Sequence, residues 1–141
     1  MRVEARRAPY MILRLPMQCF RRGCVNGLEV VVIEWSRVEE LQAEIGAEDF
    51  AEVVALFLEE ADEAVATLAG TGDAATLEAT LHFIKGSALN LGLRDLAQLC
   101  SEGERAAADG RAESVQVDVI ARTYTLSKAD LERGILARRA A

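Results

Sequence analysis

The chain has 141 residues, enough for one domain and a short tail, and its apolar content of 51% supplies one modest core. Of the net charge of −7, residues 1–33 contribute +4 through six arginines and two glutamates, which leaves −11 for the rest. Such an acidic domain argues against nucleic-acid binding, which needs clustered Lys and Arg. No stretch approaches the ~20 apolar residues of a membrane helix.

Residues 1–32 are predicted to lie outside the folded domain. They are rich in arginine, hold both prolines and two of the three cysteines, and show no sustained hydrophobic period. Three interpretations stay open: a disordered tail, a targeting segment, or sequence upstream of the natural translation start. Cys19 and Cys24 lack both the CxxC spacing and a nearby histidine, so we expect no zinc site. The odd and sparse cysteine count makes the cytoplasm the expected compartment.

An orderly helical pattern begins at Ile33. Ser36 with Glu39 forms a capping-box signature, which predicts a short helix over residues 37–45. Asp49 repeats that signature before a second helix, whose apolar residues recur at steps of three and four over about six turns. Two glycines end this second helix before residue 73.

Three further helices are predicted: between Asp73 and Gly92, from about Leu93 to Asp109, and from about Glu113 to Arg138. The first of these has an apolar face made of Leu77, Leu81, Ile84, Ala88 and Leu91. Long helices joined by short loops favour an all-α fold. We therefore expect an up-down antiparallel four-helix bundle with a short additional N-terminal helix.

His82, the only histidine, faces away from that apolar stripe. At about 100° per residue, the stripe lies within ~40° of Leu77, whereas His82 falls near 140°. Lys85 and Gly86 are its surface neighbours at i+3 and i+4. A neutral imidazole is nucleophilic near neutral pH, and a lysine one turn away can stabilise phosphoryl oxygens. A mid-helix glycine costs about 1 kcal/mol relative to alanine, and we interpret Gly86 as clearing space beside the imidazole. Leu89 lies on the same side, as a docking contact would.

The eleven residues from His82 to Gly92, HFIKGSALNLG, resemble the HxxKGSxxxLG signature of histidine-containing phosphotransfer (HPt) domains. The resemblance spans about residues 34–138. Four residues after the motif also fit: Leu96, Leu99, Cys100 and Glu104. Gly103 departs from the pattern, since a larger apolar residue is expected there, and this predicts looser packing of the helix.

The resemblance implies that residues 33–141 form an HPt domain, a phosphorelay intermediate that takes a phosphoryl group from a receiver-domain aspartate and passes it to another receiver. It makes His82 the phosphoacceptor, Lys85 its electrostatic helper, Gly86 the point of access and Ser87 a candidate polar support. No cofactor is implied, because the magnesium ion belongs to the receiver. The implied partners are response-regulator receiver domains or a hybrid histidine kinase, with no nucleic acid or membrane, and the default state is a monomer.

Two other functions stay open. The chain can be the detached phosphoacceptor part of a histidine kinase, although it holds no glycine-rich nucleotide motif, so no autonomous kinase activity is expected. Alternatively it is a receiver-binding module in which His82 is vestigial. At the level of single residues, Lys85 alone would be a solvated surface lysine. Ser87 can simply bond back to the carbonyl of Phe83.

Overall fold

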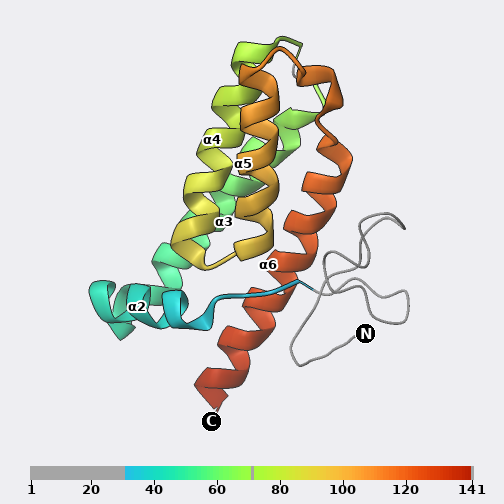
Figure 1. Ribbon diagram of the computed structural model, residues 1–141. Helices are drawn as coiled ribbons and strands as arrows, with labels where there is room; N and C mark the ends of the chain where they lie inside the picture. The colour runs from blue at the N-terminus through green and yellow to red at the C-terminus, as the bar shows by residue number, and fades with distance from the viewer. Residues whose placement is uncertain (1–30, 71, 141) are drawn as a thin grey trace, which may run out of the picture. The chain divides into compact units, whose positions relative to one another are not determined.

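A computed structural model describes residues 31–70 and 72–140 (Figure 1). The segment 1–32, with its three open interpretations and its two cysteines, lies outside the described residues except for its last two positions. Within the described ranges the chain forms five α-helices, one 3-10 turn and no β-strand. The helices are α2 (Trp35–Ile45), α3 (Ala47–Leu68), α4 (Ala74–Leu91), α5 (Arg94–Ala108) and α6 (Val117–Ala140). The predicted all-α fold with a short first helix is confirmed. No described helix is both long and apolar enough to span a bilayer.

Residues 34–124 form one compact unit, which holds α2 to α5 and the first turns of α6; the rest of α6 belongs to a second unit. Inside the first unit, α4 packs against both α3 and α5. The connections from α3 to α4 and from α4 to α5 are only a few residues long, so these three successive helices run antiparallel. The start of α6 is joined to α3 by Tyr124, whose hydroxyl donates to Asp62 and lies 3.1 Å from the carbonyl oxygen of Leu58.

The core follows the predicted apolar face of α4. All five of its residues are buried: Leu77, Leu81, Ile84, Ala88 and Leu91. From α5, Leu96 and Cys100 are buried as expected, whereas Leu99 is only half-buried. This burial fixes which side of α4 is left to face the solvent.

Two predicted helix starts are wrong, because the backbone and not a capping side chain sets where each helix begins. α2 begins at Trp35 with Glu34 as its N-cap, so Ser36 lies inside the helix. The chain is already held at Glu34, whose amide donates to the carbonyl of Gly92 at 2.8 Å. α3 begins at Ala47, because Gly46 with φ 102° turns the chain in a single residue. Asp49 therefore lies in the first turn, where its charge favours the positive end of the helix dipole.

The start of the last helix is also displaced. We predicted it near Glu113, but residues Ala112–Ser114 form a 3-10 turn and α6 begins at Val117. Two residues, the extended Val115 and Gln116, separate the turn from the helix. The predicted caps at Asp73 and Gly92 are confirmed: the Asp73 carboxylate accepts from the Thr76 amide at 2.7 Å, and Gly92 ends α4 in the left-handed region.

The junction of α4 and α5 is a tight turn built on Gly92. The amide of Leu93 donates to the carbonyl of Ala88 at 2.8 Å, the six-to-one bond of a Schellman motif. A Cβ at Gly92 would lie 2.7 Å from the carbonyl oxygen of Glu34. The entry to α2 therefore packs directly against this glycine, and no larger residue fits there.

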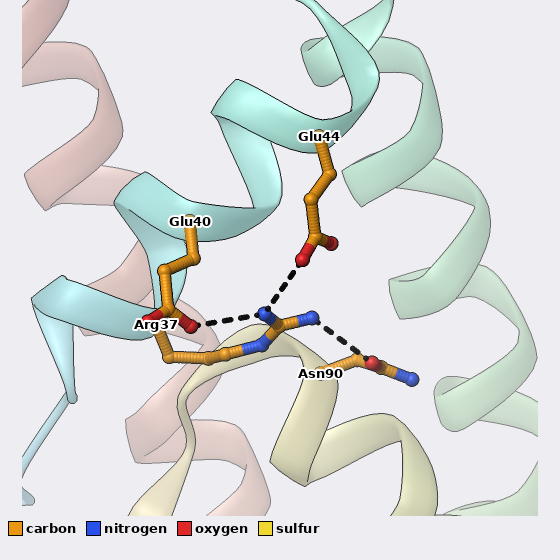
Figure 2. A network of polar contacts seen from close by, with 4 residues as sticks. All are labelled: Arg37, Glu40, Glu44 and Asn90. Carbon is orange, nitrogen blue, oxygen red and sulfur yellow. Dashed lines mark hydrogen bonds and ion pairs between the residues drawn. The ribbon is translucent and has the colours of Figure 1, made fainter.

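A polar network holds α2 to the same end of α4. Figure 2 shows the Arg37 guanidinium reaching between two carboxylates of its own helix and Asn90 of α4. Its nitrogens lie 3.2 Å from Glu40, 3.6 Å from Glu44 and 3.3 Å from the Asn90 side-chain oxygen. The turn that follows the HPt-like motif is thus fixed by both packing and charge.

The looser packing predicted at Gly103 is wrong. Gly103 is buried, and a Cβ there would lie 3.0 Å from Leu81 Cδ1 and 3.3 Å from Val115 Cγ1. Leu81 fills the space that a larger side chain at 103 would take. The absence of a side chain lets α5 approach α4 closely one residue before Glu104.

Gly92→Ala is expected to destabilise the fold more than Gly110→Ala. Both glycines have positive φ, 76° and 82°, but only Gly92 faces atoms that a methyl group would strike. Gly110→Ala should lower the free energy of unfolding by about 1–2 kcal/mol, the cost of a left-handed alanine, and Gly92→Ala by clearly more. Urea denaturation measures both, and equal losses would contradict the close packing at Glu34.

Candidate functional site

The side chain of His82 projects from the solvent-facing side of α4. It is 70% exposed, while Leu81 before it and Ile84 after it are completely buried. The periodicity argument that placed His82 opposite the core is confirmed in its geometry. The imidazole is thus fixed on a rigid helix and remains open to another protein.

Lys85 and Gly86 lie beside His82, as their spacing predicts. The Lys85 side chain is 26% exposed, so its stem is packed while its ammonium group reaches the surface. A Cβ at Gly86 would meet no atom of a neighbouring element within 4 Å. The glycine therefore does not serve close helix packing, and it leaves open surface next to the imidazole.

Two large apolar side chains on α4 are left exposed. Phe83 is 46% and Leu89 57% exposed. Leu89 is on the side predicted from the helical angle. Leu89 gives this side of α4 an apolar component that a docking protein can cover, whereas Phe83 lines a surface pocket with Ala64 and Thr67 of α3.

Ser87 lies elsewhere. It is 7% exposed, and five residues of helix separate its direction from that of His82 by about 140°. The structure therefore does not bring Ser87 to the imidazole. Any support that it gives acts through the packing of α4.

The structure adds Glu104 of α5 to the site. His82 Nδ1 lies at hydrogen-bonding distance from Glu104 Oε2, 2.7 Å, and Lys85 Nζ lies 2.8 Å from Glu104 Oε1. The resemblance included Glu104 without giving it a role. Helical periodicity alone could not find this contact, because the two residues are 22 positions apart on different helices. Only the close packing of α4 and α5 brings them together.

The Glu104 carboxylate is held in its ionised form. The ion pair with Lys85, and then the hydrogen bond from His82, lower its pKa below the ordinary value for glutamate, although partial burial opposes them. An ionised carboxylate can only accept hydrogen bonds, so His82 Nδ1 must carry the proton. In the neutral ring, Nε2 then holds the free lone pair, and it points away from Glu104.

Cys100, one turn before Glu104, takes no part in this chemistry. It is completely buried, and burial, followed by the nearby Glu104 charge, raises the pKa of its thiol to about 12. The thiol therefore stays protonated and unreactive at neutral pH. Cys100 is the small core residue that the sequence predicts.

The arrangement combines an exposed nucleophilic nitrogen with a fixed proton on the opposite nitrogen and a cation one turn away. These are the elements needed to accept a transferable anionic group such as a phosphoryl group. In the described part of the chain, no group of three or more His, Cys, Asp or Glu side chains is arranged to hold a metal ion.

Comparisons with known proteins found a matching family model and a solved structure of similar fold. The family model of the Hpt domain matches residues 52–134. Among solved structures, histidine-containing phosphotransfer protein B (HptB) from Pseudomonas aeruginosa PAO1 has a similar fold, with a TM-score of 0.65 and 24% sequence identity over 72% of this chain and 92% of that one. No curated protein matches significantly. The shared fold supports the predicted four-helix bundle.

The hydrogen bond to Glu104 predicts which tautomer His82 adopts. At about pH 8, where an ordinary histidine is neutral, we expect the proton on Nδ1, although free imidazole side chains favour Nε2. Long-range proton–nitrogen NMR correlations distinguish the two nitrogens. Glu104→Ala should shift the population towards the Nε2–H form, and a wild-type protein already in that form would contradict the assignment.

Proposed function

Because the chain belongs to the Hpt domain family, whose members are phosphorelay intermediates of two-component signalling, we propose that His82 is the residue that carries the phosphoryl group. The observation that supports this most strongly is the pairing of an exposed imidazole with the Glu104 carboxylate at Nδ1, 2.7 Å away. That contact leaves Nε2 as the nucleophile on the open side of the ring.

The transfer balances without any movement of a proton. The Nε2 lone pair attacks the phosphorus of an aspartyl phosphate, and the bond from phosphorus to the aspartate oxygen breaks with its electrons leaving on the carboxylate. The ring keeps its Nδ1 proton, still hydrogen-bonded to Glu104, and becomes a phosphoimidazolium. In the onward step, an aspartate of the next receiver attacks phosphorus and the electrons of the P–N bond return to Nε2.

The neighbours of His82 act in distinct ways. Lys85 supplies a positive charge that can pair with the oxygens of a phosphoryl group on His82. Gly86 leaves room for the approaching active site, and the exposed Leu89 offers an apolar contact to it. Ser87 keeps a role only within the packing of the helix, in keeping with its burial.

The partners of Hpt domains are receiver domains and the kinases that carry them. For this chain, we propose transfer from one receiver to another, in the cytoplasm, by a monomeric domain of residues 33–141. The family match at 52–134 and the described helices from Trp35 onward support that boundary. Two alternatives predict different labelling. A detached part of a histidine kinase would be labelled with ATP as the donor, whereas a binding module without transfer would not be labelled by any donor.

His82→Gln is expected to abolish labelling of the full chain by a receiver domain carrying a radioactive aspartyl phosphate. Glutamine keeps the helix and the polarity but has no nucleophilic nitrogen. Gel autoradiography after brief incubation measures the transfer. Undiminished transfer to His82→Gln, or no transfer to the wild-type protein from any member of a broad receiver panel, would contradict the proposal.

Gly86→Leu is expected to slow transfer by roughly ten- to hundredfold, because a side chain there displaces the partner from in-line geometry. The helix itself should become more stable, since leucine has the higher helix propensity. Ala74→Leu is the control, since it places the same leucine side chain at an exposed position at the far end of α4. Transfer at the wild-type rate by Gly86→Leu would remove the argument for access.

A further inference from the structure

Before phosphorylation, the positive charge of Lys85 is already paired with the Glu104 carboxylate. Its ammonium nitrogen lies 2.8 Å from Glu104 Oε1, while Oε2 of the same carboxylate accepts the hydrogen bond from His82 Nδ1. The carboxylate is 18% and Lys85 26% exposed, so water screens this ion pair only in part. A lysine held in this way is not free to bind phosphoryl oxygens.

A phosphoryl group on Nε2 changes the balance of charges. It places up to two negative charges within reach of Lys85, one helical turn from His82. Lysine has a flexible four-carbon stem and a compact charge, so it can change partners without moving the backbone. A Cβ at Gly86 would meet no atom of a neighbouring element within 4 Å, so the surface between the lysine and the imidazole is not filled at that position.

We infer that Lys85 exchanges Glu104 for the phosphoryl group when His82 is phosphorylated, and that Glu104 shortens the lifetime of the phosphohistidine by competing for this lysine. The inference rests on the proposed function, because it requires His82 as the phosphoacceptor. Glu104 is here a positioning residue: it acts on the phosphoryl group only through His82 and Lys85.

The direction of the effect follows from the charges in the transition state. Phosphoryl transfer passes through a loose, metaphosphate-like transition state. In that state the negative charge on the phosphoryl oxygens decreases, because electrons move onto the imidazole ring as it becomes neutral. A cation on the phosphoryl oxygens therefore stabilises the phosphohistidine more than its hydrolytic transition state. By drawing Lys85 back, Glu104 keeps the phosphoryl group labile and ready for onward transfer.

Glu104→Gln removes the negative charge of the side chain but keeps a hydrogen-bond acceptor, since the amide oxygen can still accept a hydrogen bond from His82 Nδ1. The full chain is phosphorylated with phosphoramidate, which delivers its phosphoryl group to the imidazole and releases ammonia, and the decay is followed by phosphorus NMR. We expect the half-life to lengthen by about two- to fivefold, the range for loss of one exposed or half-buried ion pair. Glu102→Gln, on the same helix and hydrogen-bonded to Gln98, is the matched control and should leave the half-life unchanged.

A double-mutant cycle with Lys85→Met tests the exchange itself. Lys85→Met alone should shorten the half-life, and adding Glu104→Gln in that background should no longer lengthen it. Equal half-lives in wild type and Glu104→Gln, or the same lengthening with and without Lys85, would overturn the inference. Failure of phosphoramidate to label His82 at all would instead count against the proposed function, so the two failures are distinguishable. Thermal unfolding by circular dichroism confirms that each variant is folded.

Discussion

The Glu104 carboxylate holds two positively polarised groups of the neighbouring helix at once, and the chemistry of the site depends on that contact. One oxygen fixes the proton on His82 Nδ1 and the other pairs with Lys85. The first contact decides which ring nitrogen is nucleophilic, and the second decides where the lysine charge rests. Neither His82 nor Lys85 could be assigned these states from its position on α4 alone.

The contact in turn depends on how closely α5 approaches α4. Gly92 ends α4 in a tight turn against the entry to α2, which sets where α5 begins. Gly103 then allows Leu81 to fill the interface one residue before Glu104. Leu81 and His82 are neighbours in the sequence, and their roles are linked. The packing of the buried Leu81 places the Glu104 carboxylate, which in turn orients the exposed His82 imidazole.

Most of what is local to one helix could be predicted from the sequence. The apolar stripe of α4, the exposure of His82 and its neighbours, and the caps at Asp73 and Gly92 all follow from periodicity and backbone preferences. The errors have tertiary causes. The start of α2 is set by a backbone bond from Glu34 to Gly92, and the packing at Gly103 is set by a side chain 22 positions away, Leu81. The role of Glu104 could not be predicted for the same reason, since a contact between two helices leaves no periodic signal in the sequence.

The proposed function requires the phosphoryl group to reside on Nε2 of His82, opposite the nitrogen held by Glu104. Phosphorus–nitrogen coupling in the NMR spectrum of the nitrogen-15-labelled, phosphorylated full chain identifies the bonded atom directly. We expect a single coupled nitrogen, Nε2 of His82, with Nδ1 still carrying its proton. A phosphoryl group on Nδ1, or on any other residue, would contradict it.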